Sequence, residues 1–350
     1  MNQPTKGPEE TGAAPSGDST SAVVSVDRIG PPPWPTDDPF LFCVHHHDAY
    51  PRSDGNQAPA PTLAGRNIGS DFSSKDGWSM YHGSRVPGFP RHPHRGFETV
   101  TVVRRGLVDH CDSMGATARY GAGDTQWLTA GGGIQHAEMF PLTEQGRDNP
   151  LELFQIWLNL PAADKMAKPH FSMFWRDQVP KIVGHDAANR STEVTVVAGR
   201  IGGAIAPAPP PDSYASKADS DVAIWTLRMS ANAHFTLPPA ASAATRRSLY
   251  LYDGEVKIGD DAPLSGRCRI HLRGDRSADL YAGAKGADLL LLQGKPIGEP
   301  VAHHGPFVMN TRAELQQAFA DYHATGFGGW KWRSDDPVHD QDDGRFAVHA

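Results

Sequence analysis

The chain has 350 residues, enough for two domains, and 39% of them are hydrophobic, so packed cores are expected. Its formal net charge is -7 and no lysine- or arginine-rich block occurs, which argues against direct nucleic-acid binding. The sequence has no apolar run long enough for a membrane span, and its polar start does not predict a secretory signal. Cys43, Cys111 and Cys268 are scattered and odd in number, which favours a reducing compartment, and we expect a cytoplasmic protein.

Short apolar runs separated by glycines follow a polar beginning. Residues 1–22 are rich in Pro, Gly, Ser and Thr and are expected to be a disordered tail, and residues 49–74 predict a long loop. The runs ETVTVV (98–103), TQWLTA (125–130) and LFQIWLNL (153–160) have the length and composition of strands. This pattern indicates an all-β fold, either a sandwich or a barrel.

A second β-rich region covers residues 193–293 and is interrupted by a proline-rich stretch at 206–220, which we interpret as an exposed loop. The two regions predict a duplicated β-barrel, with a first domain over 23–180 and a second over 181–332. We expect residues 333–350 to form a flexible tail.

One helix is predicted, over residues 311–324 at the end of the second domain. Thr311 and Glu314 have the spacing of a capping box, in which each side chain bonds the other residue's backbone N–H. The apolar positions that follow lie on one helical face, which we expect to dock on a barrel exterior: Leu315, Ala318, Phe319 and Tyr322.

The segment RHPHRGFETV contains His92 and His94, two residues apart in a predicted strand. Side chains at i and i+2 of a strand point to the same face, so both imidazoles can reach one metal ion. Pro93 cannot donate a hydrogen bond to a neighbouring strand, which favours an edge position or a strand start. By the same alternation Glu98 is expected on the face of the histidines, as a carboxylate candidate.

A second pair, His136 and Glu138, follows the glycine turn of TAGGGIQHAEMF with the same spacing. Three imidazoles and one carboxylate could hold Fe(II) and leave positions open for water, oxygen or substrate. Glu138 and Glu98 compete for the carboxylate role. Other polar clusters have simpler interpretations. Asp109, His110 and Asp112 are expected in a turn, and the run 45–47 is expected either in a solvated loop or with one local hydrogen bond.

Several blocks of the sequence resemble the pirin family of the cupin superfamily. They are HPHRGFETVTVV, QWLTAGGGIQHAEMFP, LELFQIWLNLP and the C-terminal LLLQGKPIGEPVAHHGPFVMNTRAELQQAFADYHATGFGGWKW, and the similarity extends over about 38–332. The resemblance implies a bicupin of two packed β-barrels, with one divalent metal ion, usually iron, in the first barrel only. The implied ligands are His92, His94, His136 and Glu138, and Glu98 becomes a neighbour of the metal.

The resemblance also implies two alternative functions. One is a quercetin 2,3-dioxygenase type of activity, in which a small aromatic flavonol and O₂ react at Fe(II), with Glu138 or Glu98 accepting the substrate hydroxyl proton. The other is a non-catalytic, metal- or redox-dependent binding protein that regulates a transcription factor or a metabolic enzyme. The segment FCVHHHDAY and the stretch between the two metal motifs depart from the better-known members, so the substrate or partner stays open at this stage.

Overall fold

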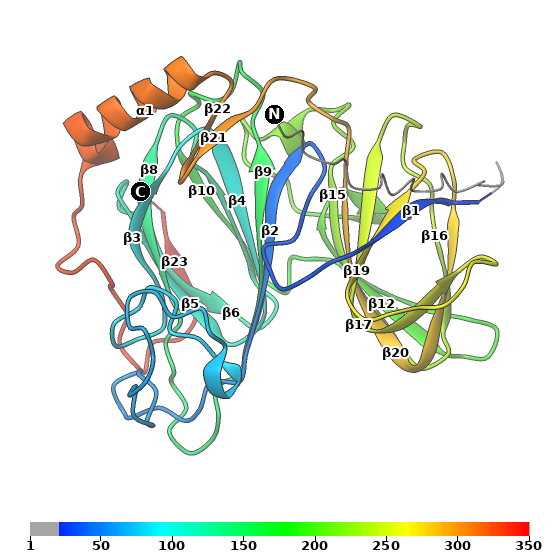
Figure 1. Ribbon diagram of the computed structural model, residues 1–350, viewed down its shortest axis with the longest axis horizontal. Helices are drawn as coiled ribbons and strands as arrows, with labels where there is room; N and C mark the ends of the chain where they lie inside the picture. The colour runs from blue at the N-terminus through cyan, green and yellow to red at the C-terminus, as the bar shows by residue number, and fades with distance from the viewer. Residues whose placement is uncertain (1–20, 350) are drawn as a thin grey trace, which may run out of the picture.

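The computed structural model describes residues 21–349, so the predicted tail at 1–22 lies almost wholly outside the described residues. Two β-domains lie side by side, and one α-helix packs against the first of them (Figure 1). The prediction of an all-β bicupin with a C-terminal helix is therefore confirmed. Within the described part of the chain, no helix is both long and apolar enough to cross a membrane.

The first barrel consists of two five-stranded antiparallel sheets. One sheet has the order β10 (His170–Phe174), β7 (Thr125–Thr129), β4 (Phe97–Arg105), β9 (Leu151–Asn159) and β2 (Phe40–Asp48). The other has the order β23 (Phe346–Val348), β6 (Thr117–Gly121), β5 (Leu107–Asp112), β8 (Ile134–Met139) and β3 (Gly88–His94). The strand β3, which contains Pro93, lies at an edge, as the missing N–H requires.

The second barrel is one nine-stranded sheet folded on itself. Its main path runs β1 (Val23–Arg28), β19 (Cys268–Leu272), β17 (Arg246–Ile258), β20 (Ala278–Gly294), β15 (Ala223–Met229), β12 (Ser191–Ala198) and β11 (Lys181–His185). Off this path, β16 (His234–Leu237) pairs with β20 and β18 (Leu264–Ser265) with β17. Register shifts within the β17–β20 pair interrupt its regular pairing where the long strands bend.

The remaining elements are short. They are the hairpins β13–β14 (Arg200–Ile201, Ala204–Ile205) and β21–β22 (Ala302–His304, Phe307–Met309) and the 3₁₀ turns η1 (Lys75–Gly77), η2 (Tyr214–Ser216) and η3 (Gly326–Gly328). Residues 49–74 contain no strand or helix, which confirms the predicted long loop. The loop is nevertheless held in place, because Arg66 stacks on Trp78 at 3.3 Å and bonds Asp71 at 2.9 Å.

The first strand of the described chain belongs to the second barrel, and its last strand belongs to the first barrel (Figure 1). The strand β1 pairs with β19 of the second barrel, so the predicted start of the first domain at residue 23 is wrong. Conversely, β23 pairs with β6 of the first barrel, so residues 333–349 are not the flexible tail that we expected. A strand edge accepts a partner from any part of the chain, and local sequence does not reveal which segment will fill it.

The helix α1 (Arg312–Thr325) also packs on the first barrel. Its capping box is confirmed, since the Thr311 hydroxyl accepts from the Glu314 N–H and the Glu314 carboxylate accepts from the Thr311 N–H. Leu315 and Ala318 are buried, and Phe319 and Tyr322 pack beside them against β22 and η3. The Tyr322 hydroxyl also lies 3.2 Å from the side-chain carbonyl of Gln135 on β8.

Three hydrophobic cores explain how the barrels hold together. One fills the second barrel, one fills the first, and a third lies between them and includes the ring stack of Trp34 on Tyr250. The stretch 206–220 contributes Tyr214 and Ala215 to this third core, and its Ser213 is buried. The stretch 206–220 is thus a loop, as we expected, but only part of it is exposed, because residues 213–215 cover apolar surface between the barrels.

Candidate metal centre

Three histidines converge inside the first barrel, from the two strands that the sequence motifs predict. His92 and His94 lie on β3 and His136 lies on β8, directly across from His92. Ligand atoms of the three imidazoles lie within 4.8 Å of one another. Pairs of ring centroids are 4.5 to 4.9 Å apart, so the rings surround one point. This spacing suits shared coordination of a single ion.

The turn before β8 brings His136 to this point. Gly133 has φ +131°, a conformation that residues with a side chain rarely adopt, and a Cβ there would lie 2.6 Å from the Phe327 ring. Only glycine therefore allows η3 to close over the turn that starts β8. The third glycine of TAGGG thus has a steric role beside the metal motif.

The three imidazoles are neutral and available as ligands. Burial lowers the pKa of His92 to about 4 and holds the pKa of His94 and of His136 well below the usual value. Both ring nitrogens of His136 are buried without a hydrogen-bond partner among the described residues. Such orphaned polar atoms are costly unless another group satisfies them. A divalent transition metal fits this environment, because neutral imidazoles offer it lone pairs.

Glu138 lies beside the cluster, with Oε2 3.9 Å from His136 Nε2. Gln155 Nε2 donates to Oε2 of Glu138 at 2.7 Å, and the Thr101 hydroxyl lies 3.0 Å from Oε1. Burial raises the pKa of the Glu138 carboxyl. Its place as the fourth ligand stays a prediction, since the close cluster of ligand atoms comprises the three histidines alone.

The side chain of Glu98, on β4, points away from the three histidines and toward the second barrel. Our expectation that it shares the face of the histidines is therefore wrong. Its Oε1 accepts hydrogen bonds from Trp127 Nε1 at 3.0 Å and Thr129 Oγ1 at 2.7 Å, and its Oε2 accepts from Ser213 Oγ at 2.6 Å. These donors face the second barrel. The alternation breaks at Gly96 (φ +84°), where the chain leaves one sheet for the other. A Cβ at this position would lie 1.9 Å from the Val308 carbonyl oxygen.

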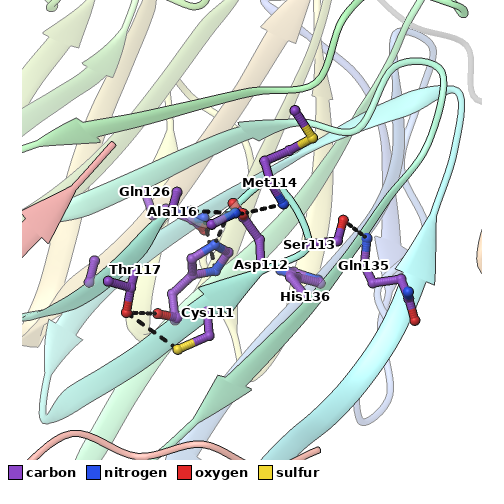
Figure 2. Close-up of polar contacts among 12 residues, drawn as sticks. Cys111, Asp112, Ser113, Met114, Ala116, Thr117, Gln126, Gln135 and His136 are labelled. Carbon is purple, nitrogen blue, oxygen red and sulfur yellow. Dashed lines mark hydrogen bonds and ion pairs between the residues drawn. The ribbon is translucent and has the colours of Figure 1, made fainter. Parts of the chain in front are cut away.

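His110 and Asp112 adjoin the cluster, although we expected them in a turn. Both lie on β5, where His110 is opposite Glu138 and Asp112 is opposite His136. His110 Nε2 lies 3.2 Å from Asp112 Oδ2, and its ring centroid is 5.4 Å from that of His136. The Asp112 carboxylate also accepts from backbone N–H groups of the turn after β5, those of Met114 and Ala116 (Figure 2) and that of Gly115. The alternating pattern of VDHCD could have indicated a strand, but it does not reveal that this strand pairs with β8.

The histidine run 45–47 belongs to the strand β2 and not to a solvated loop. His45 and His46 are buried and His47 is exposed. His45 Nε2 lies 3.3 Å from Glu152 and the ring faces the core between the barrels, whereas His46 contacts the rings of Tyr81, Phe89 and Phe140. Because side chains alternate along β2, His45 and His46 point to opposite faces of this strand.

A cavity of about 880 Å³ opens onto the cluster. His92, His94 and Glu138 line one part of it, and the long loop contributes Phe72 and Ser74. Aromatic side chains form much of the remaining wall: Phe42, Tyr81, Phe89, Phe140 and Trp157. Its volume falls within the range of about 300–1,000 Å³ that is typical of small-molecule sites.

The second barrel holds its histidines apart from one another. His234 Nε2 lies 3.2 Å from Asp279, and His271 lies between Asp27 and Asp37 at 3.0 and 3.2 Å. Each of these imidazoles therefore has a carboxylate partner near the surface of its own sheet. The absence of metal from this domain stays a prediction.

Fold and site together define a bicupin protein whose first barrel has a three-histidine site that can bind a metal ion. The chain belongs to the pirin family. The family model "Pirin" matches residues 56–158, and the model "Pirin C-terminal cupin domain" matches residues 224–328.

Named relatives occur in bacteria and animals. A pirin-like protein of Caulobacter vibrioides is 38% identical over 67% of this chain and 79% of its own length, and human pirin is 33% identical over 69% and 78%. A Vibrio cholerae protein with the provisional name quercetin 2,3-dioxygenase is 32% identical over 80% of this chain and 95% of its own. Among solved structures, quercetin 2,3-dioxygenase from Acinetobacter baumannii aligns over 83% of this chain and 86% of its own, with a TM-score of 0.65 and 26% identity.

Proposed function

We propose that this protein is a metal-dependent dioxygenase of the quercetin 2,3-dioxygenase type, which opens the ring of a flavonol-like substrate with O₂. The observation that carries the proposal is the position of the neutral three-histidine cluster at a cavity with aromatic walls. The relatives that carry this activity in their names support it. Free buried thiols at Cys43, Cys111 and Cys268 support a cytoplasmic setting.

The proposed cofactor is one Fe(II) ion, held by His92, His94, His136 and Glu138. When bound, such an ion supplies Lewis acidity and access to O₂ at the positions that the protein leaves open. Gln155 and Thr101 orient the Glu138 carboxylate through their contacts at 2.7 and 3.0 Å.

Within this proposal, Glu138 accepts the hydroxyl proton of the flavonol. The raised pKa of its buried carboxyl makes it a better proton acceptor than an exposed glutamate. Phe42 and Trp157, whose ring centroids are 4.7 Å apart, provide apolar surface for the planar rings and exclude water from them. Glu98 has no part in this step, because its three donors hold it on the other face of β4.

An aerobic assay with quercetin tests the activity. Protein loaded with Fe(II) should remove the flavonol absorbance and release carbon monoxide, and the variant with both His92→Ala and His136→Ala should do neither. Turnover no faster than that of free Fe(II) would refute the proposal for this substrate.

A second candidate is a metal-dependent binding protein that regulates a protein partner. The observation that favours it is the exposure of two apolar side chains on the long loop, Phe72 at 55% and Ile68 at 40%, the first of which also lines the cavity. Pull-down with metal-loaded, oxidised and metal-free protein distinguishes this function. A partner that binds all three forms equally would contradict it.

A further inference from the structure

A buried histidine without a hydrogen-bond partner lines the cavity outside the metal centre. His46 lies on β2, is only 7% exposed and borders the cavity. Among residues 21–349, no side chain or backbone group forms a hydrogen bond or ion pair with its imidazole. Both ring nitrogens of His136 are inaccessible, whereas those of His46 are not. The His46 nitrogens are therefore accessible from the cavity that this residue lines.

Aromatic side chains hold this imidazole in one orientation. The rings of Tyr81, Phe89 and Phe140 contact it edge-on, with centroids 4.7, 5.7 and 6.0 Å away. Tyr81 is fixed in turn, because its hydroxyl donates to Asp48 at 2.7 Å and the same carboxylate accepts from the Ser79 N–H at 2.9 Å. A side chain that is already ordered loses little entropy when a ligand binds to it.

The imidazole is neutral. Burial, together with a smaller effect of the nearby His45, lowers the pKa of His46 to about 3. A neutral imidazole has one N–H donor and one acceptor nitrogen, which is the complement of a hydroxyl group. Because the walls around it are aromatic, a ligand hydroxyl is the group that would satisfy both its polarity and its position.

The pairing of β2 with β9 places His46 on the same cavity wall as Gln155, which orients the Glu138 carboxylate beside the metal centre. On the paired strands β2 and β9, Val44 is opposite Gln155 and His46 is opposite Leu153. Gln155 bonds Glu138, and His46 is two residues beyond Val44, which is about 7 Å further along the strand. A planar molecule with one hydroxyl at the metal centre would therefore extend along this wall toward His46.

We propose that His46 contacts the substrate and hydrogen-bonds a hydroxyl on the part of an aromatic molecule that lies away from the metal centre. The inference rests on the proposed function and narrows its substrate class to planar aromatics with hydroxyl groups on separate rings. His46 is thereby a specificity-determining residue, since an aromatic without the distal hydroxyl leaves its imidazole unsatisfied.

The variant His46→Phe tests this contact, because phenylalanine keeps the aromatic packing and removes both nitrogens. Binding of quercetin and of unsubstituted flavone is measured on protein loaded with Zn²⁺, which has no redox chemistry, through quenching of the fluorescence of tryptophans such as Trp157 in the wall. We expect quercetin to bind about tenfold more weakly, which is the effect of one lost hydrogen bond, and flavone affinity to stay unchanged.

The controls separate a lost contact from a damaged fold. His185→Ala removes an exposed histidine on β11 and should change neither affinity. Metal content and the thermal midpoint of His46→Phe should match those of the wild type. His46→Met, a second apolar variant, carries the test if His46→Phe does not fold, and His46→Gln should recover part of the quercetin affinity.

The outcomes separate this inference from the proposed function. Unchanged quercetin affinity in the apolar variants, or equal losses for quercetin and flavone, would overturn the inference while quercetin turnover by the wild type stands. A wild-type protein that neither binds nor turns over quercetin would overturn both.

Discussion

His92 and His136 face each other directly across the antiparallel strands β3 and β8, with ring centroids 4.5 Å apart. One pair of strands thus joins two sequence motifs that are far apart in the chain. Each motif alone provides a pair of side chains on one strand face, and the register between the strands makes them a single site.

Removal of both facing histidines should abolish metal binding. Purified wild-type protein is expected to contain close to one transition metal ion per chain, and the variant with His92→Ala and His136→Ala only background metal, because His94 and Glu138 alone are too few ligands to hold the ion. Elemental analysis measures this, with His185→Ala as the control for loss of a surface histidine. Equal metal content in the double variant and the wild type would refute the ligand assignment.

The side chain of Gln155 should tune metal affinity without being a ligand. Its Nε2 donates to Glu138 at 2.7 Å, so Gln155→Leu leaves that carboxylate less well oriented. Loss of such a supporting bond lowers metal affinity about 10- to 100-fold in comparable sites. Competition with a chelator measures the effect. Unchanged affinity in Gln155→Leu would contradict this supporting role of Gln155.

Glu98 should make the stability of the protein depend on pH. Burial raises the pKa of its carboxyl to about 7, above the value near 4.5 expected in the unfolded chain. The folded state therefore favours the protonated form, and this stabilisation is complete below pH 4.5 and lost as the pH rises through 7. The total effect is on the order of 3 kcal/mol.

The variant Glu98→Gln, which cannot ionise, should lack this decrease in stability. Urea unfolding at pH 5 and pH 8 measures the free energy of unfolding of both proteins. Glu193→Gln, at an exposed ion pair with Lys181, serves as a control and should keep the pH dependence of the wild type. If Glu98→Gln loses as much stability between the two pH values as the wild type, the carboxyl is already ionised at pH 5.

The C-terminal segment should depend on a buried ion pair. Arg119 donates to both carboxylate oxygens of Asp109, at 2.7 and 2.8 Å, and also to the backbone carbonyl of Asp340 at 2.6 Å. Both charged side chains of the pair are fully buried. Arg119→Ala leaves the Asp109 charge without its partner and should cost about 3–5 kcal/mol in the free energy of unfolding.

An exposed pair in the same barrel offers a matched control. Arg147 bonds Glu144 at 2.7 Å, but the two side chains are 76% and 47% exposed, so Arg147→Ala should leave the denaturant midpoint unchanged. Limited proteolysis should also cut the C-terminal segment faster in Arg119→Ala. Equal midpoints for the two variants would contradict the role of Arg119.

The spacing of residues along the chain was sufficient for features that depend on local geometry. His92 with His94, and His136 with Glu138, fall on one strand face because side chains alternate with a period of two. The capping box of Thr311 and Glu314 is equally local, because it lies within one helical turn. These features were predictable because they need no knowledge of which strands pair.

Only the tertiary structure decided what depends on strand partners and on breaks in the alternation. The alternation of side chains is interrupted at Gly96, so Glu98 faces the second barrel. The pairing of β5 and of β2 with their neighbours brings His110 and His46 into the interior of the first barrel. The exchange of β1 and β23 between the barrels has the same origin. The sequence by itself determined which side chains could bind a metal, because alternation is a property of one strand. The fold decided which of them meet, because pairing joins residues that no short stretch of chain contains.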